Sequence, residues 1–273
     1  MKIAVCFKVV PDFDQMIEAD WDNFSPSADP EYVRRVFGCF DEGALETALR
    51  LRSAWEEGGE KTECTAVTAA ALPAPLCKTL FAAGFDRVLD LSGAFSGESP
   101  EFRPRRTAAV LGDCLGSAGY DLVLAGRQTG YADTGTVPLL LAEHLGIPVI
   151  TEAGEIVPCE GGVEISRTAG TGRERLRVRL PLLAVLGNGP VTALRAATLR
   201  ALMAASGRAA EKPHLSVSGE ADIPAAGTGP DSAGALRFHR ERRHKICRFV
   251  PGGADLARSI GEIRAEYLKE WER

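Results

Sequence analysis

Residues 121–150 read DLVLAGRQTGYADTGTVPLLLAEHLGIPVI, which is an apolar run, a polar loop and a helical run in that order. The run DLVLAG (121–126) is short and apolar, and it predicts a buried strand that ends at Gly126. The run VPLLLAEHLG (137–146) predicts a helix closed by Gly146. In open α/β sheets, ligands bind beyond the carboxyl ends of the strands. The loop between this strand and this helix is therefore a candidate binding site.

The start of the predicted helix is suited to an anion. Thr134, Gly135 and Thr136 are small or carry hydroxyls, so the first backbone N–H groups of the helix are accessible at the positive end of its dipole. Such a pattern is typical of a phosphate site. On these residues alone, an ordinary N-cap made by Asp133 and Thr134 is the simpler interpretation.

Strands and helices alternate on the N-terminal side of this stretch. Asp41 is the expected N-cap of the first helix, and Gly58-Gly59 is its expected end. Alternation of this kind predicts a doubly wound, mostly parallel sheet. The predicted strands are 2–10 (ended by Pro11), 62–71 and 86–92, and the predicted helices are 41–57, 73–85 and 104–120.

The pattern changes after residue 150. Alternating runs separated by glycines predict a β meander that returns to the sheet, followed by a short alanine-rich helix, an exposed arm and an amphipathic helix. We therefore expect an α/β domain at 1–210 and a C-terminal arm with a helix at 211–273. The expected elements are strands within 149–159, 162–169 and 174–186, a helix within 195–210, an arm at 211–236 and a helix at 253–273.

Composition excludes other classes of protein. The formal net charge of -5 provides no general attraction for nucleic acid. No apolar run approaches the length of a membrane span or of a secretory signal, so we expect a soluble, cytoplasmic protein without membrane insertion. The seven cysteines are odd in number and widely spaced, which predicts reduced core residues rather than a zinc site. No nucleophile motif or P-loop is present, so we name no catalytic and no metal-binding residues.

Segments along the whole chain resemble one known family. MKIAVCFKVVPD (1–12) resembles the first strand of electron-transfer flavoprotein beta subunits, which typically read VKxVPD, and FDEGALETALRLR (40–52) resembles their NPFDEYALEEALRLK helix. Residues 121–150 align without a gap with the family signature LVLxGxQAxDxDTxQVGPxLAExLGxP. RERLRVRLPLLAVL (173–186) and LRAATLRALMAA (194–205) resemble the family's ETLRLKLPxxxTV and RYATLPNIMKA stretches.

The resemblance implies a fold, a partner and a function. The fold would be a layered, flavodoxin-like sheet of the adenine-nucleotide α-hydrolase-like type. The partner would be an electron-transfer flavoprotein alpha subunit, which carries the electron-transferring FAD. The beta subunit of this family holds AMP or, in electron-bifurcating members, a second FAD. Electrons would pass between a dehydrogenase and a downstream electron acceptor.

Matched position by position, the resemblance also implies site residues. Leu199 falls where the family places the leucine that anchors on a partner dehydrogenase, and Arg195 flanks it. The alternative is a plain surface helix in which Leu199 and Leu202 face the sheet. The implied nucleotide contacts are Cys6, Gly38, Cys39, Phe40, Asp41, Thr68, Ala69, Gly126, Arg127, Gln128, Thr129, Asp133, Thr134, Gly135, Thr136 and Val137.

The chain departs from the family pattern around the implied site. Gly38-Cys39 replaces Asn-Pro, Tyr131 replaces the first Asp of the loop, and Thr136 replaces its Gln. Pro138 has no N–H and removes one donor if it lies in the first helical turn. AMP, FAD and a degenerate site therefore all stay open.

Two other functions compete with this interpretation. A stand-alone adenine-nucleotide-binding module of the same fold, with a regulatory or stress role, stays open. An adenylate-forming ATPase is disfavoured, because VVPDFD (9–14) stands where its SGGxDS-type pyrophosphate loop would be.

Overall fold

The computed structural model describes residues 1–15, 33–95, 100, 103–129, 135–170, 172–215 and 256–271. The chain divides into two compact units, 1–226 and 227–273, and each is described by itself. In the second unit the described element is helix α7 (Leu256–Trp271). Among the described residues, no helix combines the length and the apolar character needed to cross a bilayer.

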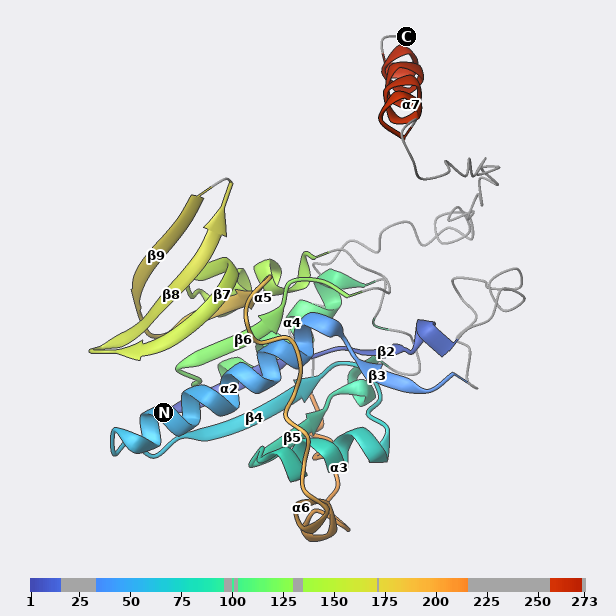
Figure 1. Cartoon of the computed structure of the whole chain (residues 1–273). Coiled ribbons are helices and arrows are strands. Elements are labelled where there is room, and N and C mark those ends of the chain that lie inside the picture. The colour runs from blue at the N-terminus through green and yellow to red at the C-terminus, as the bar shows by residue number, and fades with distance from the viewer. Residues whose placement is uncertain are drawn as a thin grey trace, which may run out of the picture. The chain divides into compact units, whose positions relative to one another are not determined.

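Strands and helices alternate between residues 39 and 145, as predicted (Figure 1). The strands of the first unit are β1 (Lys2–Cys6), β2 (Val9–Pro11), β3 (Arg35–Phe37), β4 (Glu63–Thr68), β5 (Arg87–Asp90), β6 (Leu122–Gly126), β7 (Val149–Cys159), β8 (Gly162–Ala169), β9 (Gly172–Arg179) and β10 (Leu182–Leu186). Its helices are α2 (Cys39–Glu57), α3 (Ala74–Ala83), α4 (Pro104–Gly116), α5 (Val137–Leu145) and α6 (Leu199–Ala204), with 3-10 turns η1 (Phe13–Gln15) and η2 (Ser92–Phe95).

Within the described part of the first unit, eight strands form the main sheet in the order β5-β4-β1-β6-β10-β7-β8-β9. The pairs from β5 to β7 are all parallel, whereas β8 and β9 add antiparallel strands at one end (Figure 1). The predicted doubly wound, mostly parallel sheet is confirmed. The predicted meander is also present, and β10 returns from it into the sheet between β6 and β7.

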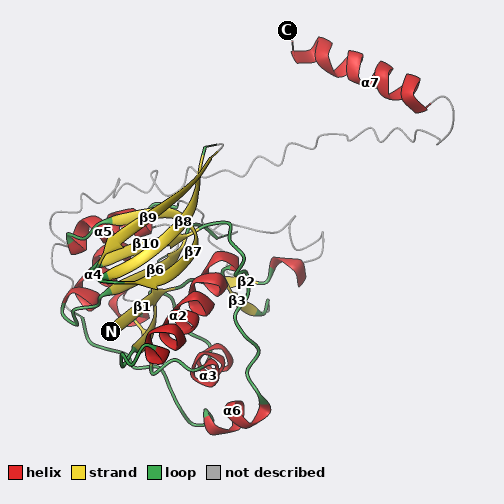
Figure 2. Ribbon diagram, turned by 60° about the vertical axis from the view of Figure 1, so that its left-hand side comes forward, coloured by secondary structure: helices red, strands yellow, loops and turns green. Residues whose placement is uncertain are grey.

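Helices cover both faces of the sheet. Successive residues of a strand point to opposite faces. Ile3 and Val5 of β1 therefore pack in the cluster that includes α2 and α3, while Ala4 and Cys6 pack in the cluster that includes α4 and α5. Figure 2 shows the two pairs of helices on opposite sides of the sheet. Because both faces are buried, β1 and β6 read as continuous apolar runs rather than alternating ones.

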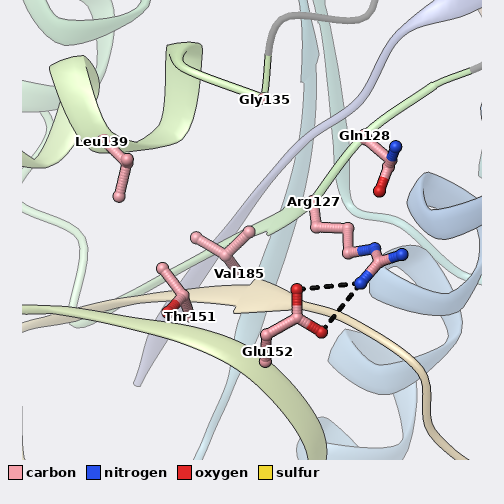
Figure 3. Close-up of a pocket in the computed structure, with 7 residues that line it drawn as sticks. All are labelled: Arg127, Gln128, Gly135, Leu139, Thr151, Glu152 and Val185. Atoms are coloured by element: carbon pink, nitrogen blue, oxygen red, sulfur yellow. Dashed lines mark hydrogen bonds and ion pairs between the residues drawn. The ribbon is translucent and has the colours of Figure 1, made fainter. Parts of the chain in front are cut away.

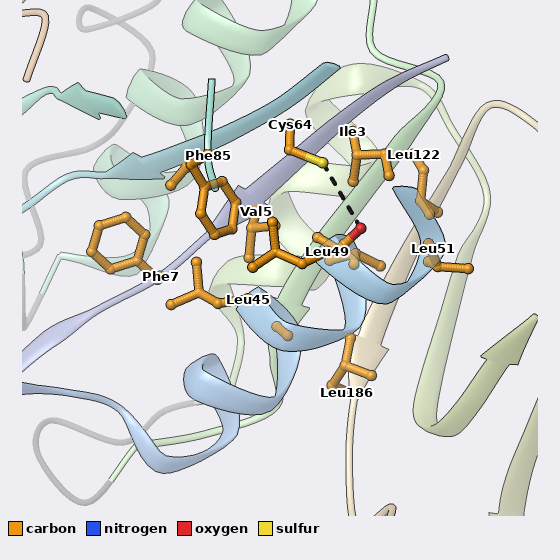
Figure 4. Packing of buried hydrophobic residues seen from close by; sticks show 14 of the residues in the cluster. Ile3, Val5, Phe7, Leu45, Leu49, Leu51, Cys64, Phe85, Leu122 and Leu186 are labelled. Carbon is orange, nitrogen blue, oxygen red and sulfur yellow. Dashed lines mark hydrogen bonds between the residues drawn. The ribbon is translucent and has the colours of Figure 1, made fainter. Parts of the chain in front are cut away.

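The core beneath α2 explains one of the cysteines (Figure 4). Leu45 and Leu49 lie one turn apart on α2 and are fully buried in the same cluster as Val5. The Cys64 thiol lies in this cluster and donates to the carbonyl oxygen of Ala48, with an S···O distance of 3.8 Å. Burial raises the pKa of the Cys64 thiol to about 12, so the group stays protonated.

The cysteine prediction is correct for four of the seven residues, since Cys6, Cys64, Cys77 and Cys114 are buried. It is wrong for Cys39, which is exposed at the start of α2. Cys159 is partly buried, and Cys247 lies outside the described residues.

The predicted strand at 2–10 is two strands. β1 ends at Cys6, and β2 pairs with β3 in a separate two-stranded sheet. The Phe7 N–H still donates to the Val67 carbonyl (3.0 Å), but the Lys8 N–H donates to the Asp41 carboxylate (3.0 Å). The chain therefore leaves the main sheet at Lys8, where the Asp41 side chain takes the place of strand β4 as the hydrogen-bond acceptor.

Helix α2 begins at Cys39 with Gly38 as its N-cap, so the prediction of Asp41 as N-cap is wrong. Asp41 lies in the first turn, and its carboxylate accepts hydrogen bonds from two other segments instead of from its own helix. The helix ends with Gly58 as its C-cap, as predicted.

Helix α6 is shorter than the helix predicted within 195–210. The side chain of its N-cap, Thr198, accepts the Ala201 N–H at 3.2 Å. Beyond α6 the chain returns to the edge of the sheet, where the Glu211 N–H donates to the Val88 carbonyl and the Glu211 carboxylate pairs with Arg87 at 2.6 Å. Residue 211 is thus attached to β5.

Candidate functional site

A cavity of about 120 Å³ lies at the carboxyl ends of β1, β4 and β6. The register of the sheet aligns Cys6 of β1 with Val67 of β4 and with Ala125 of β6, so the three strands end side by side. Helices α2, α4 and α5 also contribute to the lining. This is the edge at which open α/β sheets bind ligands.

Ten of the sixteen residues named from the resemblance meet at this cavity. They come from four separate segments, and the parallel order of the strands brings them together. The ten are Cys6, Asp41, Thr68, Ala69, Gly126, Arg127, Gln128, Thr129, Gly135 and Val137.

Four of the other named residues are described but do not line the cavity. Gly38 is buried, and a Cβ there would collide with a carboxylate oxygen of Asp41, which leaves no room for a side chain. Cys39 is exposed. The Phe40 ring stacks under the Arg127 guanidinium, 4.8 Å from the ring centroid. Thr136 is the exposed N-cap of α5.

The remaining two named residues, Asp133 and Thr134, lie outside the described residues, as does Tyr131. Sequence reasoning missed eight residues of the lining. Lys8 could have been found, because it is the lysine of the VKxVPD run, and Pro138 is the proline noted at the start of the predicted helix, whereas the other six have no local signal. The eight are Phe7, Lys8, Ala70, Pro100, Thr107, Leu111, Ala125 and Pro138.

The Asp41 carboxylate joins three segments beneath the cavity. One oxygen accepts the Lys8 N–H at 3.0 Å and the other accepts the Gly126 N–H at 3.1 Å. The side chain is buried, and burial raises the pKa of Asp41 to about 7, opposed by these two hydrogen bonds and by the charge of Lys8. At Gly126 a Cβ would lie 2.5 Å from the same carboxylate, so this close approach requires glycine.

The N-terminus of α5 faces the cavity through Gly135, Val137 and Pro138. Gly135 has a φ of 61°, in the left-handed region that glycine adopts without strain. Pro138 lies within the first turn, as the sequence suggested, and it supplies no N–H. With the cations Lys8 and Arg127 in the same lining, this end of the cavity is suited to an anion.

A larger cavity of about 330 Å³ adjoins the first (Figure 3). Arg127, Gln128 and Gly135 line both. Typical ligand pockets measure about 300–1,000 Å³, so the larger cavity is within that range and the smaller is below it. No sequence pattern pointed to its other lining residues, which are Leu139, Thr151, Glu152 and Val185.

The residues expected to bind a partner lie on and before α6. Leu199 is 74% exposed and Met203, one turn later, is 69% exposed. The alternative in which Leu199 faces the sheet is therefore wrong. The Arg195 guanidinium is bonded to both carboxylate oxygens of Glu46 at 2.9 and 3.0 Å, and the Arg195 N–H also donates to this carboxylate.

We expect Arg195→Ala to lower the free energy of unfolding by about 1–2 kcal/mol, because it leaves the buried Glu46 carboxylate with fewer partners. This loss of stability is smaller than that expected for breaking a fully buried pair, because Arg195 is 41% exposed and Arg50 also contacts Glu46. Urea denaturation measures the change, and Arg200→Ala, at an exposed arginine of α6, is the control. Equal stability of the two variants would contradict the prediction.

The fold and the adjoining cavities define a class: open α/β proteins with a ligand site at the carboxyl ends of parallel strands. Comparison with known proteins narrows this class of open α/β proteins to one family. Residues 31–218 match the electron transfer flavoprotein domain. More than half of the chain is matched, and the chain belongs to the electron transfer flavoprotein domain family.

Individual relatives are distant. The chain is 30% identical over 187 residues to the electron transfer flavoprotein subunit beta of Clostridium acetobutylicum, covering 67% of each chain. It is 27% identical over 206 residues to the acryloyl-CoA reductase electron transfer subunit gamma of Anaerotignum propionicum, covering 74% of this chain and 73% of that one. It is 25% identical over 209 residues to the putative electron transfer flavoprotein subunit YgcR of Escherichia coli, covering 75% of this chain and 78% of that one.

Proposed function

We propose that this chain is the beta-type subunit of an electron-transfer flavoprotein heterodimer and holds an adenine nucleotide, AMP or FAD, at the carboxyl edge of its sheet. The observation that carries the proposal is the convergence of ten residues, named from the resemblance, on one cavity. The relative from Clostridium acetobutylicum, named as a beta subunit, supports the same assignment.

The residues present fit such a nucleotide. Leu111 and Val137 give the cavity apolar walls for a base or sugar, and Lys8 and Arg127 provide cations for phosphates. The backbone at Gly135 permits a close approach of phosphate to the start of α5. FAD supplies electron-carrying chemistry when it is bound, whereas AMP has a structural role. This chain's residues would bind and orient either group.

The proposal includes partners. The relatives named above are designated subunits, which supports a heteromeric assembly with an alpha subunit. That alpha subunit would hold or share the electron-transferring FAD, and electrons would pass between a dehydrogenase and a downstream acceptor. The exposed Leu199 and Met203 give α6 an apolar surface with which a partner can pack.

Co-expression with an alpha-type subunit tests the proposal. We expect a yellow heterodimer in gel filtration, and we expect heat to release AMP or FAD from this subunit in addition to the FAD of the partner. A chain that binds nucleotide but forms no heterodimer would instead support the stand-alone nucleotide-binding module. A heterodimer that releases no AMP, ADP or second FAD would contradict a nucleotide at this site.

We expect Leu199→Ala to slow electron transfer from the dehydrogenase about tenfold, because one exposed apolar anchor supplies much of a weak contact. The melting temperature should not change, since the side chain is 74% exposed. Stopped-flow measurement of flavin reduction by the dehydrogenase gives the rate, and reduction by dithionite should be unaffected.

The control is Val157→Ala, which truncates an exposed apolar residue (42%) on β7, away from α6. Equal rates for the wild type and the Leu199→Ala variant would exclude Leu199 as the anchor.

A further inference from the structure

Arg127 lies between the two cavities, and its partner belongs to the larger one (Figure 3). One terminal nitrogen of its guanidinium donates to both carboxylate oxygens of Glu152, at 2.9 and 3.0 Å. The guanidinium also stacks on the ring of Phe40. Its Nε is buried and has no hydrogen-bond acceptor among the described residues. The pair with Glu152 therefore leaves part of the donor capacity of Arg127 unused.

Glu152 occupies a position that the backbone is specially shaped to provide. Between the pairs Ala184–Ile150 and Leu186–Ala153, β7 contains one more residue than β10, which is a β-bulge. Within this bulge Glu152 has a φ of 57°, in the left-handed region that is unfavourable for such a side chain. Strained backbone of this kind is concentrated at functional sites.

The neighbouring strand also accommodates this carboxylate. A Cβ on Gly187, just after β10, would lie 2.5 Å from a carboxylate oxygen of Glu152 and 3.0 Å from its Cα. The Gly187 N–H donates to the Ala153 carbonyl at 2.9 Å, which closes the bulge. Bulge and glycine together direct Glu152 toward Arg127.

The chemistry of the pair allows it to exchange partners. Arginine keeps its charge at every accessible pH, and its planar guanidinium binds carboxylate and phosphate oxygens in the same geometry. The Arg127 and Glu152 side chains are 30% and 39% exposed, so separating them costs little. The terminal phosphate of AMP or ADP carries more negative charge than a carboxylate, so it is the stronger partner.

We propose that Glu152 is a specificity-determining residue whose carboxylate competes with the phosphates of a bound nucleotide for Arg127. The inference rests on the proposed function, because it requires a nucleotide at the adjoining cavities. Binding then includes transfer of Arg127 from Glu152 to a phosphate oxygen. Glu152 weakens the binding of every phosphorylated ligand and leaves an uncharged nucleoside unaffected.

The test uses Glu152→Gln, which removes the charge and keeps the size of the side chain. Calorimetry on the full-length chain, freed of bound nucleotide with charcoal, compares adenosine, AMP and ADP. We expect the variant to bind AMP and ADP roughly three- to tenfold more tightly than the wild type, with adenosine unchanged. Glu155→Gln, at an exposed carboxylate of the same strand, is the matched control and should match the wild type.

A double-mutant cycle with Arg127→Gln shows whether Glu152 acts through Arg127. We expect Glu152→Gln to have little effect in the Arg127→Gln background. An equal gain with and without Arg127 would overturn the competition, because Glu152 would then act by simple repulsion. AMP and ADP affinities that are the same in the wild type and Glu152→Gln would overturn the inference alone. Absence of binding of any nucleotide by both proteins would overturn the proposed function and this inference with it.

Discussion

Replacing Asp41 with alanine is expected to lower the free energy of unfolding by about 3 kcal/mol. The variant removes the buried side chain that accepts two backbone N–H groups, those of Lys8 and Gly126. It also removes the link between the end of β1, the end of β6 and the first turn of α2. Urea denaturation followed by circular dichroism measures the loss.

Asp121 provides a matched control, since its carboxylate accepts the Lys2 N–H at 2.7 Å at the opposite end of β1. Because that site is exposed, water can replace the carboxylate, and Asp121→Ala should cost about 1 kcal/mol or less. An equal loss of stability in the two alanine variants would show that the burial of Asp41 is not the cause.

The same carboxylate makes stability depend on pH. The pKa of Asp41 is raised from 3.8 to about 7, chiefly by burial, so the folded state holds this proton more tightly than the unfolded state. The contribution of Asp41 is therefore fully present below about pH 4 and is lost as pH rises toward and through 7.

Asp41→Asn isolates this effect. It keeps the shape of the side chain but can accept only one of the two N–H groups, because its other terminal atom is a donor. We expect a smaller loss of stability than in the alanine variant and a flatter stability profile between pH 4 and 7. Denaturation at several pH values supplies the comparison, and a wild-type profile in the asparagine variant would assign the dependence to another group.

Gly135→Val is expected to weaken nucleotide binding at least tenfold while the protein stays folded. Valine at a φ of 61° is strained, and relieving that strain moves the backbone at the start of α5, where the proposed phosphates bind. Nucleotide released by heat from the purified heterodimer gives a direct measurement.

Helix α5 contains its own control at its other end. Gly146, the C-cap, has a φ of 63° and lines neither cavity. Gly146→Val should therefore cost a similar amount of stability, about 1–2 kcal/mol, and retain the nucleotide. Equal retention in both variants would place the nucleotide elsewhere.

Local patterns predicted the strand–loop–helix unit at the centre of the site correctly. β6 ends at Gly126 and α5 closes at Gly146, as the apolar run and the glycine indicated. The same kind of reasoning was wrong for Asp41. An aspartate before a helical run is typical of an N-cap, but the N–H groups that it accepts lie 33 and 85 residues away along the chain.

Periodicity, glycine positions and family motifs are properties of neighbouring residues, and they sufficed for the sheet class, for most of the elements and for ten residues of one cavity. The larger cavity could not be found in this way. It depends on the bulge in β7, on Gly187 after β10 and on Arg127 after β6. These three strands are far apart in the sequence and come together only in the folded sheet. The Arg127–Glu152 pair follows from that assembly, because the register of paired strands, and not the sequence around either residue, brings the two charges within 3.0 Å.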